Sequence, residues 1–156
     1  MDMTLLEPPL RLLAAVAAGS LIGLDRDLHG KPTGLRIHAL VALGAAILTS
    51  AGAELSARDP AAASRIIQGI VGGIGFLGAG VIMRSDHGTR IVNLTTATSI
   101  WLTAALGVVC GLGDWKLAGM GSAAAFVVLV AGRWIDRALF GRLGPEDEPP
   151  PPDGNA

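Results

Sequence analysis

The chain has 156 residues, of which 51% are hydrophobic, 16% are charged and 22 are glycine. Apolar residues and glycine together make up about 65% of the sequence, whereas soluble domains reach roughly 45–50% and carry about 25% charged residues. This composition all but excludes a soluble enzyme. It predicts an all-α membrane protein whose helices pack closely within the lipid bilayer.

Five apolar stretches are long enough to cross a bilayer, which takes about 20 residues of helix. We predict membrane spans at residues 9–24, 35–53, 66–83, 92–112 and 115–130. The N-terminal flank is acidic where a signal peptide needs basic residues, so the first span is expected to be retained. Residues 1–8 then form a short periplasmic segment, and residues 9–143 form one five-helix membrane domain.

The first span ends at a cluster of charged residues. Asp25, Arg26 and Asp27 follow it directly, and Arg36 and His38 open the second span after a short loop. Charges near the membrane are retained when they are paired or when they line a pathway. We therefore expect Asp25 or Asp27 to pair with Arg36 or His38, in a cluster that is either structural or a site for an ion or a partner. For His38 a purely structural role is at least as well supported.

A second polar group precedes the third span. Asp59 stands directly before Pro60, which predicts an N-cap followed by proline at the first helical position. Arg65 and Gln68 are three residues apart, so they share one helix face and are expected to pair across helices.

The third span is rich in glycine. Its glycines are Gly69, Gly72, Gly73, Gly75, Gly78 and Gly80. Residues 73–78 match G-x-G-x-x-G, but that dinucleotide-binding fingerprint requires a preceding strand and a following soluble helix, and here it lies inside a charge-free span. Close packing against another helix is the favoured interpretation. The alternative is an unwound segment whose carbonyl groups face an ion.

The fourth span carries a polar stripe of Thr95, Thr96, Thr98, Ser99 and Thr103. Hydroxyl groups can bond the preceding turn's carbonyl oxygens or form hydrogen bonds between helices. We expect interhelical hydrogen bonds, with a hydrated lining that faces the glycine-rich helix as the alternative. The single cysteine, Cys110, excludes an intrachain disulfide and gives no metal-ligand spacing.

Charge distribution predicts the orientation. Eight of the twelve Lys and Arg residues fall on one side of the spans, namely Arg26, Lys31, Arg36, Arg84, Arg90, Arg133, Arg137 and Arg142. The positive-inside rule places that side in the cytoplasm and the N-terminus outside. Residues 144–156 are acidic and proline-rich, which predicts a disordered cytoplasmic tail. Because this tail sets the isoelectric point, the net charge of −1 gives no indication of a nucleic-acid partner.

Four segments of the sequence together resemble the membrane domain of the MgtC/SapB family. They are residues 20–27, 31–41, 68–82 and 93–101, which follow one another in the family's order. Asp25 and Asp27 stand where the family usually has Glu, Ile37 where it has Thr, and Asn93 where Gly is common. The resemblance implies a five-helix protein of the bacterial inner membrane, in a short form without the soluble C-terminal domain that some members carry. It also implies a link to adaptation to low magnesium and, in some bacteria, to virulence.

These observations favour a non-enzymatic protein without a cofactor that acts through helix contacts in magnesium or ion homeostasis or in stress adaptation. Its expected partners are the lipid bilayer, a second copy in a dimer, and another membrane protein. The alternative is a subunit of a transporter or channel for magnesium or another cation, with the charged cluster and the polar stripe along the ion path.

Overall fold

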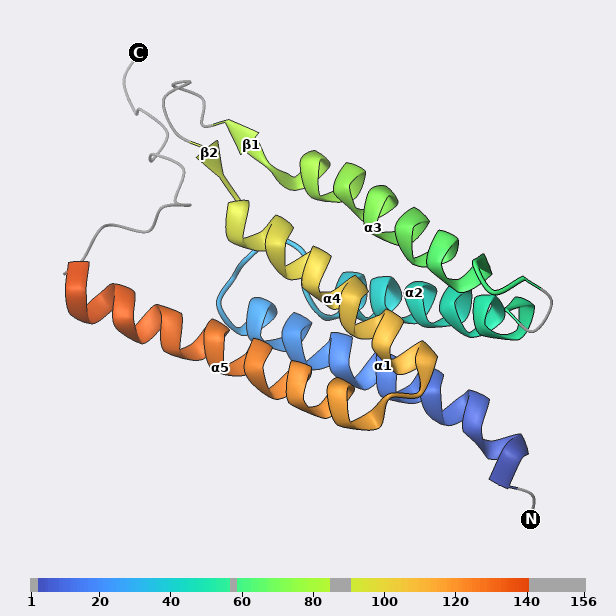
Figure 1. The fold of residues 1–156 in the computed structure, drawn as a ribbon. Helices are drawn as coiled ribbons and strands as arrows, with labels where there is room; N and C mark the ends of the chain where they lie inside the picture. Colours follow the sequence, from blue (N-terminus) through green and yellow to red (C-terminus); the bar gives the residue numbers. More distant parts are fainter. Residues whose placement is uncertain (1–2, 57–58, 85–90, 141–156) are drawn as a thin grey trace.

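The computed structural model describes residues 3–56, 59–84 and 91–140, and these form five long helices and a two-stranded hairpin (Figure 1). In chain order the elements are α1 (Met3–Leu28), α2 (Leu35–Leu55), α3 (Ala62–Val81), β1 (Met83–Arg84), β2 (Ile91–Val92), α4 (Leu94–Leu112) and α5 (Trp115–Phe140). Each helix is long and apolar enough to cross a membrane. The prediction of a helical protein with five helices that could each span a membrane is confirmed for the described residues.

Successive helices run in opposite directions, so the connections collect at two ends of the bundle (Figure 1). The α1–α2 loop, the β1–β2 hairpin and the last turns of α5 lie at one end, which we call the basic end because Arg26, Lys31, Arg36 and Arg133 lie there. The start of α1, the α2–α3 connection and the α4–α5 turn lie at the opposite end. The predicted tail, residues 144–156, lies outside the described residues.

Helix α1 is longer at both ends than the predicted span at residues 9–24. It continues through Pro8 and Pro9, the sixth and seventh residues of the helix, where each proline removes one backbone hydrogen bond. At the other end the helix runs to Leu28, so the charged residues 25–27 lie within its last turns rather than after it. The helix does not end at these charges because partners on other helices bind them.

The ends of the other helices lie closer to the ends of the predicted spans, except the C-terminal end of α5. Helix α2 begins at the predicted residue, and α3 begins at Ala62 rather than at residue 66. The hairpin, which the sequence did not predict, takes the last residue of the predicted third span, Met83, and the first residue of the fourth, Val92, and these two are paired. Helix α5 continues ten residues beyond the predicted end and so carries Arg133 within the helix.

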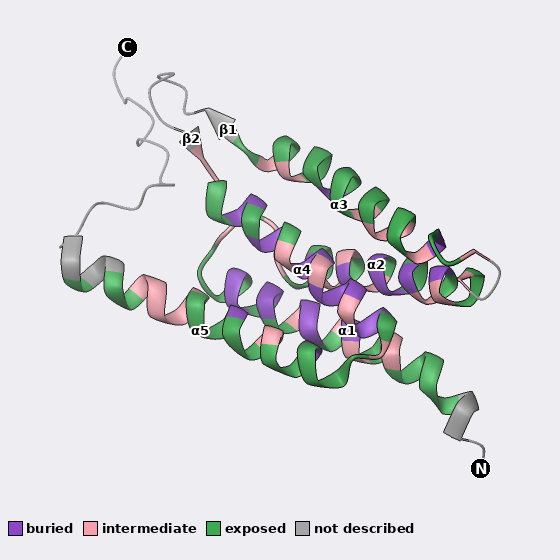
Figure 2. Cartoon of the chain, viewed as in Figure 1, coloured by how far each residue is buried: buried purple, intermediate pink, exposed green. Residues whose placement is uncertain are grey.

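Helix α4 lies at the centre of the bundle, with 61% of its span buried (Figure 2). Its glycines permit close contact with α2. A Cβ atom added at Gly107 would overlap the carbonyl oxygen of Ala42, and one added at Gly111 would lie 2.7 Å from that of Ala46. Ala42 and Ala46 are fully buried in this contact. Small-xxx-small packing therefore joins α2 and α4, whereas the sequence had indicated the glycines of the third span.

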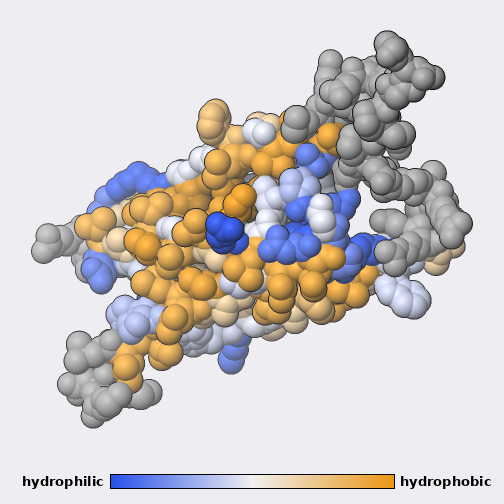
Figure 3. Space-filling model, turned by 180° about the vertical axis from the view of Figure 1, so that it is seen from behind, coloured by the Kyte–Doolittle hydropathy of each residue, from blue (hydrophilic) through white to orange (hydrophobic). Residues whose placement is uncertain are grey.

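Helix α3, in contrast, is largely uncovered: only 6% of its span is buried (Figure 2). The face of the molecule in Figure 3 is mostly hydrophobic, with hydrophilic residues at one end and in a patch that extends from the other end toward the middle. This distribution suits a bundle that is surrounded by lipid, because apolar side chains then need no protein cover.

Candidate functional site

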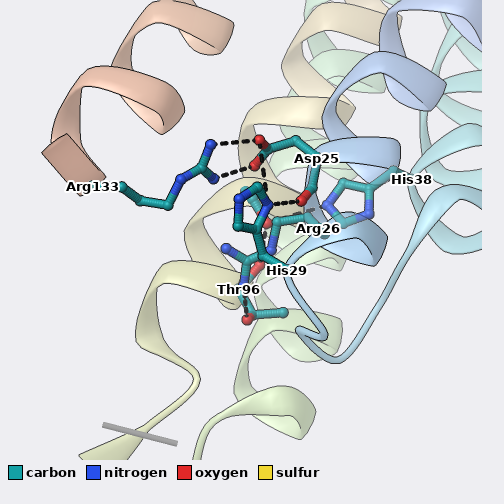
Figure 4. A network of polar contacts seen from close by, with 7 residues as sticks. Asp25, Arg26, His29, His38, Thr96 and Arg133 are labelled. Atoms are coloured by element: carbon teal, nitrogen blue, oxygen red, sulfur yellow. Dashed lines mark hydrogen bonds and ion pairs between the residues drawn. The ribbon is translucent and has the colours of Figure 1, made fainter. Parts of the chain in front are cut away.

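The candidate site is a network of polar side chains at the basic end, several of which are buried (Figure 4). Its strongest contact joins α1 to α5. Both terminal nitrogens of Arg133 donate hydrogen bonds to the carboxylate of Asp25, at 2.6 and 2.7 Å. The Asp25 side chain is 6% exposed and that of Arg133 is 29% exposed. His29, one turn after Asp25, donates from Nδ1 to the Asp25 backbone oxygen at 2.6 Å. The expected pairing of Asp25 with Arg36 or His38 is therefore wrong.

Arg26 points away from Asp25 toward α4. Its guanidinium group donates a hydrogen bond to the hydroxyl oxygen of Thr96, and both residues are buried. A cation at this depth persists because polar groups replace part of its water shell. Thr96 therefore holds a charged side chain of α1 against the middle helix of the bundle.

His38 makes the corresponding contact between α2 and α4. Its Nδ1 donates to the carbonyl oxygen of Gly34 at 3.0 Å, and its Nε2 lies 3.1 Å from the hydroxyl oxygen of Ser99. The single Ser99 hydroxyl proton has two acceptors within reach, His38 Nε2 and the carbonyl oxygen of Thr96 at 2.8 Å. Neutral His38 with its proton on Nδ1 accepts that hydrogen bond at Nε2. His38 is fully buried, so the pair is shielded from water.

Asp27 fixes the α1–α2 loop through a backbone contact. Its Oδ2 accepts a hydrogen bond from the backbone N–H of Leu35, the first residue of α2, at 2.9 Å. Gly34 leaves room for this contact, because a Cβ atom at that position would overlap the Asp27 carboxylate and displace it. Arg36 is exposed and makes no hydrogen bond or ion pair with the described part of the chain.

The polar residues at the opposite end, Asp59, Arg65 and Gln68, make only local contacts among the described residues. Arg65 forms an exposed ion pair with Asp59, and Gln68 lies 3.5 Å from the hydroxyl of Ser64 on its own helix. Neither contact crosses to another helix. Asp59 is not the N-cap of α3, which is Ala61; its carboxylate instead accepts the Ala61 N–H at 3.0 Å. An Asx-type turn therefore precedes the helix.

The hydroxyl stripe divides between two sides of α4. Thr96, Ser99 and Thr103 are buried, whereas Thr95 and Thr98 are exposed. The expectation of hydrogen bonds between helices holds for Thr96 and Ser99, while Thr103 bonds the Ser99 carbonyl oxygen at 2.8 Å. Thr96 contacts α1 and Ser99 contacts α2, so for these two hydroxyls the alternative of a lining that faces the glycine-rich helix is wrong.

The glycines of α3 do not make the close contacts within the chain that their spacing allows. A Cβ atom at Gly69, Gly72, Gly73, Gly75 or Gly80 would meet no atom within 4 Å among the described residues. At Gly78 it would lie 3.8 Å from the Cβ atom of Ala97, which is ordinary contact. The segment stays helical throughout, so the unwound alternative is wrong.

Two residues that hold the bundle together, Arg133 and Arg11, are not identified as contact residues by the sequence. Arg133 stands in the sequence only as one of the basic residues at a span boundary. Arg11 donates to the carbonyl oxygen of Gly111 at 3.2 Å and to Glu7 at 2.8 Å, so it binds the C-terminal end of α4. A lone arginine inside an apolar span was the available signal, because such charges are retained for a specific contact.

The chemistry available in the network is that of charge pairing and hydrogen bonding. In the part of the chain that the structure describes, no three His, Cys, Asp or Glu side chains gather as metal ligands. Cys110 is buried in an apolar cluster with Ala15, Ala42 and Ala46. The polar network of Asp25, Arg26, His38 and Arg133 therefore joins α1, α2, α4 and α5 at one membrane boundary.

Comparison with known proteins identifies one matching family and several similar proteins. The model of the MgtC family matches residues 12–138. Protein SrpB of Synechococcus elongatus is 38% identical over 140 residues, which cover 83% of this chain and 77% of SrpB. Protein MgtC of Salmonella typhimurium is 46% identical over 122 residues, which cover 78% of this chain and 49% of that protein. The Escherichia coli K12 protein named "Putative magnesium transporter YhiD" is 42% identical over 124 residues, with 76% and 56% covered. This chain thus spans about half the length of the MgtC and YhiD proteins, and no solved structure matches it.

Proposed function

The chain belongs to the MgtC family of membrane proteins, and from this premise we propose that it is a non-enzymatic protein of the bacterial inner membrane that acts through helix contacts in ion homeostasis. Helix α3 is the contact element and a second copy of the chain is its first partner. The name of the YhiD relative makes magnesium the first cation to test.

The uncovered glycine face of α3 carries this proposal. Gly72, Phe76 and Gly80 form one row at a spacing of four residues, and the Phe76 side chain is 82% exposed. A bulky side chain between two glycines offers both a projection and a recess, so two copies can fit against each other. Each glycine inside a helix costs about 0.5–1 kcal/mol relative to alanine, and contact between copies offsets that cost.

A second candidate function is ion transport, and one observation favours it. Arg26, His38, Thr96, Ser99 and Thr103 are buried polar residues that follow one another from the basic end into the bundle. Polar side chains inside a membrane domain often mark ion pathways or proton relays. Their hydrogen bonds to one another also suit a structural role, so we rank transport second.

Two measurements separate the candidates. Oligomer mass in lipid nanodiscs should fall from dimer to monomer in Phe76→Ala and Gly72→Leu. Phe126→Ala, which changes an exposed phenylalanine of α5, is the matched control and should stay dimeric.

Magnesium flux into proteoliposomes should equal that of protein-free vesicles. Flux that disappears in a folded Asp25→Asn variant would replace our proposal with the transport function.

A further inference from the structure

An apolar groove lies between α2 and α3. It has a volume of about 540 Å³, and its lining is almost entirely apolar. Leu40, Gly44 and Leu48 contribute from α2, and Gly69, Gly73 and Leu77 contribute from α3. Three glycines line it, and a Cβ atom at any of them would meet no other atom within 4 Å. The groove is therefore open at the level of the membrane interior.

A positively charged side chain, that of Arg36, lies beyond one end of this groove. Arg36 precedes Leu40 by one helical turn, about 6 Å along the axis of α2. Its side chain is exposed and forms no ion pair with the described residues. The nearby Asp27 carboxylate is bound to the Leu35 N–H. Arg36 therefore presents its charge at the membrane boundary while the groove continues into the hydrocarbon region.

The dimensions favour a slender occupant over a helix. Between the levels of Ile66 and Leu77 the groove follows eleven residues of α3, about 17 Å. A helix of that length, with a diameter of about 10–12 Å, occupies on the order of 1,300 Å³ or more. The groove volume instead falls within the roughly 300–1,000 Å³ of small-molecule sites. A hydrocarbon chain in the groove would bring its headgroup to the level of Arg36.

We infer that the α2–α3 groove is a binding site for an anionic phospholipid, with an acyl chain against Gly44, Gly69 and Gly73 and the headgroup phosphate at Arg36. Basic residues between transmembrane helices recognise lipid headgroups in this way. The site lies beside the Gly72–Phe76–Gly80 row, so lipid binding and dimer formation can be measured separately.

The test is lipid retention by the full chain, purified and delipidated in a mild detergent and measured by native mass spectrometry. Phosphatidylglycerol is compared with phosphatidylcholine of the same acyl chains and with inorganic phosphate. Wild type should retain phosphatidylglycerol about tenfold better than phosphatidylcholine and should not bind phosphate alone. Arg36→Gln should lower phosphatidylglycerol retention about fivefold, the ratio for the roughly 1 kcal/mol of one surface cation.

Groove-filling variants test the chain-binding part. Gly73→Leu and Gly44→Leu project from opposite walls into open space, and each should lower retention at least fivefold. The matched controls are Gly75→Leu, on the same helix but outside both the groove lining and the Gly72–Phe76–Gly80 row, and Lys116→Gln at the opposite end. Both should leave retention unchanged. Equal retention of the two lipids, or unchanged retention in both groove variants, would overturn the inference. Loss of the dimer without loss of lipid in Gly73→Leu would assign the groove to a second copy.

Discussion

The carboxylate of Asp25 and the guanidinium group of Arg133 form a two-point ion pair, although 108 positions separate them in the sequence. Only 11% of the α5 span is buried, so apolar packing holds this helix weakly. The ion pair therefore fixes the end of α5 against α1. A bidentate arginine–carboxylate contact is suited to this role because it sets direction as well as distance.

Removing the Asp25 charge should destabilise the protein. Asp25→Asn keeps the shape of the side chain but leaves Arg133 partly buried without its counter-charge. Breaking such a pair costs about 3–5 kcal/mol when both partners are buried. Because Arg133 is 29% exposed, we expect a loss nearer 2–3 kcal/mol in the free energy of unfolding, measured by denaturation in detergent.

The double variant Asp25→Asn/Arg133→Gln tests whether this cost arises from the pair. It should be no less stable than Asp25→Asn alone, since the second change removes the unpaired cation. Lys116→Gln, a change of an exposed cation, should alter stability by less than about 0.5 kcal/mol. Additive effects of the two substitutions would contradict the ion pair.

Replacing glycine by alanine should have opposite effects on the free energy of unfolding in α4 and in α3. Gly107→Ala places a methyl group against the carbonyl of Ala42 and forces α2 and α4 apart, which should cost about 1–3 kcal/mol. Gly75→Ala projects into open space and should be neutral or stabilise the helix by up to about 1 kcal/mol. Thermal unfolding of both variants in the same detergent measures the difference. Similar effects would contradict the observed packing of α4.

This contrast shows where prediction from the sequence succeeded and failed. Span number and approximate position follow from apolar length, which is a local property. Which glycine permits a close helix crossing depends on which helices are neighbours, so glycine density alone indicates the third span and does not point to Gly107 or Gly111. Likewise, local spacing suggested Arg36 as the partner of Asp25, whereas the fold brings Arg133 to it. The predicted helix ends are wrong where tertiary contacts stabilise charged residues inside the last turns.

Asp27 and Gly34 should show coupled effects. Asp27→Ala removes the hydrogen bond to the Leu35 N–H and should cost about 1 kcal/mol. Gly34→Ala displaces the same carboxylate and should cost at least as much. In the double variant the methyl group has no carboxylate to displace, so the cost should be less than the sum of the two. Strict additivity in denaturation experiments would show that the two residues act independently.

The hydroxyl contacts should contribute less than the ion pair. Ser99→Ala removes the partner of His38 Nε2, and Thr96→Val removes an acceptor of Arg26 while keeping the side-chain shape. Hydrogen bonds between membrane helices average about 0.6 kcal/mol, and those to charged groups reach about 1.5–3 kcal/mol. Thr96→Val should therefore be the more destabilising change. Thr98→Val, at an exposed position of the same helix, is the matched control.

The basic end should face the cytoplasm. Cys110 is the single cysteine and is buried, so Cys110→Ala provides a cysteine-free background in which to test this. In that background, Lys116→Cys exposes a thiol at the opposite end and Pro32→Cys exposes one in the α1–α2 loop. Because eight of the twelve basic residues fall on the Pro32 side, a membrane-impermeant maleimide should label only Lys116→Cys in intact spheroplasts. Pro32→Cys should react after permeabilisation. The reverse pattern would invert the orientation, and labelling of both thiols in intact spheroplasts would indicate two orientations in the membrane.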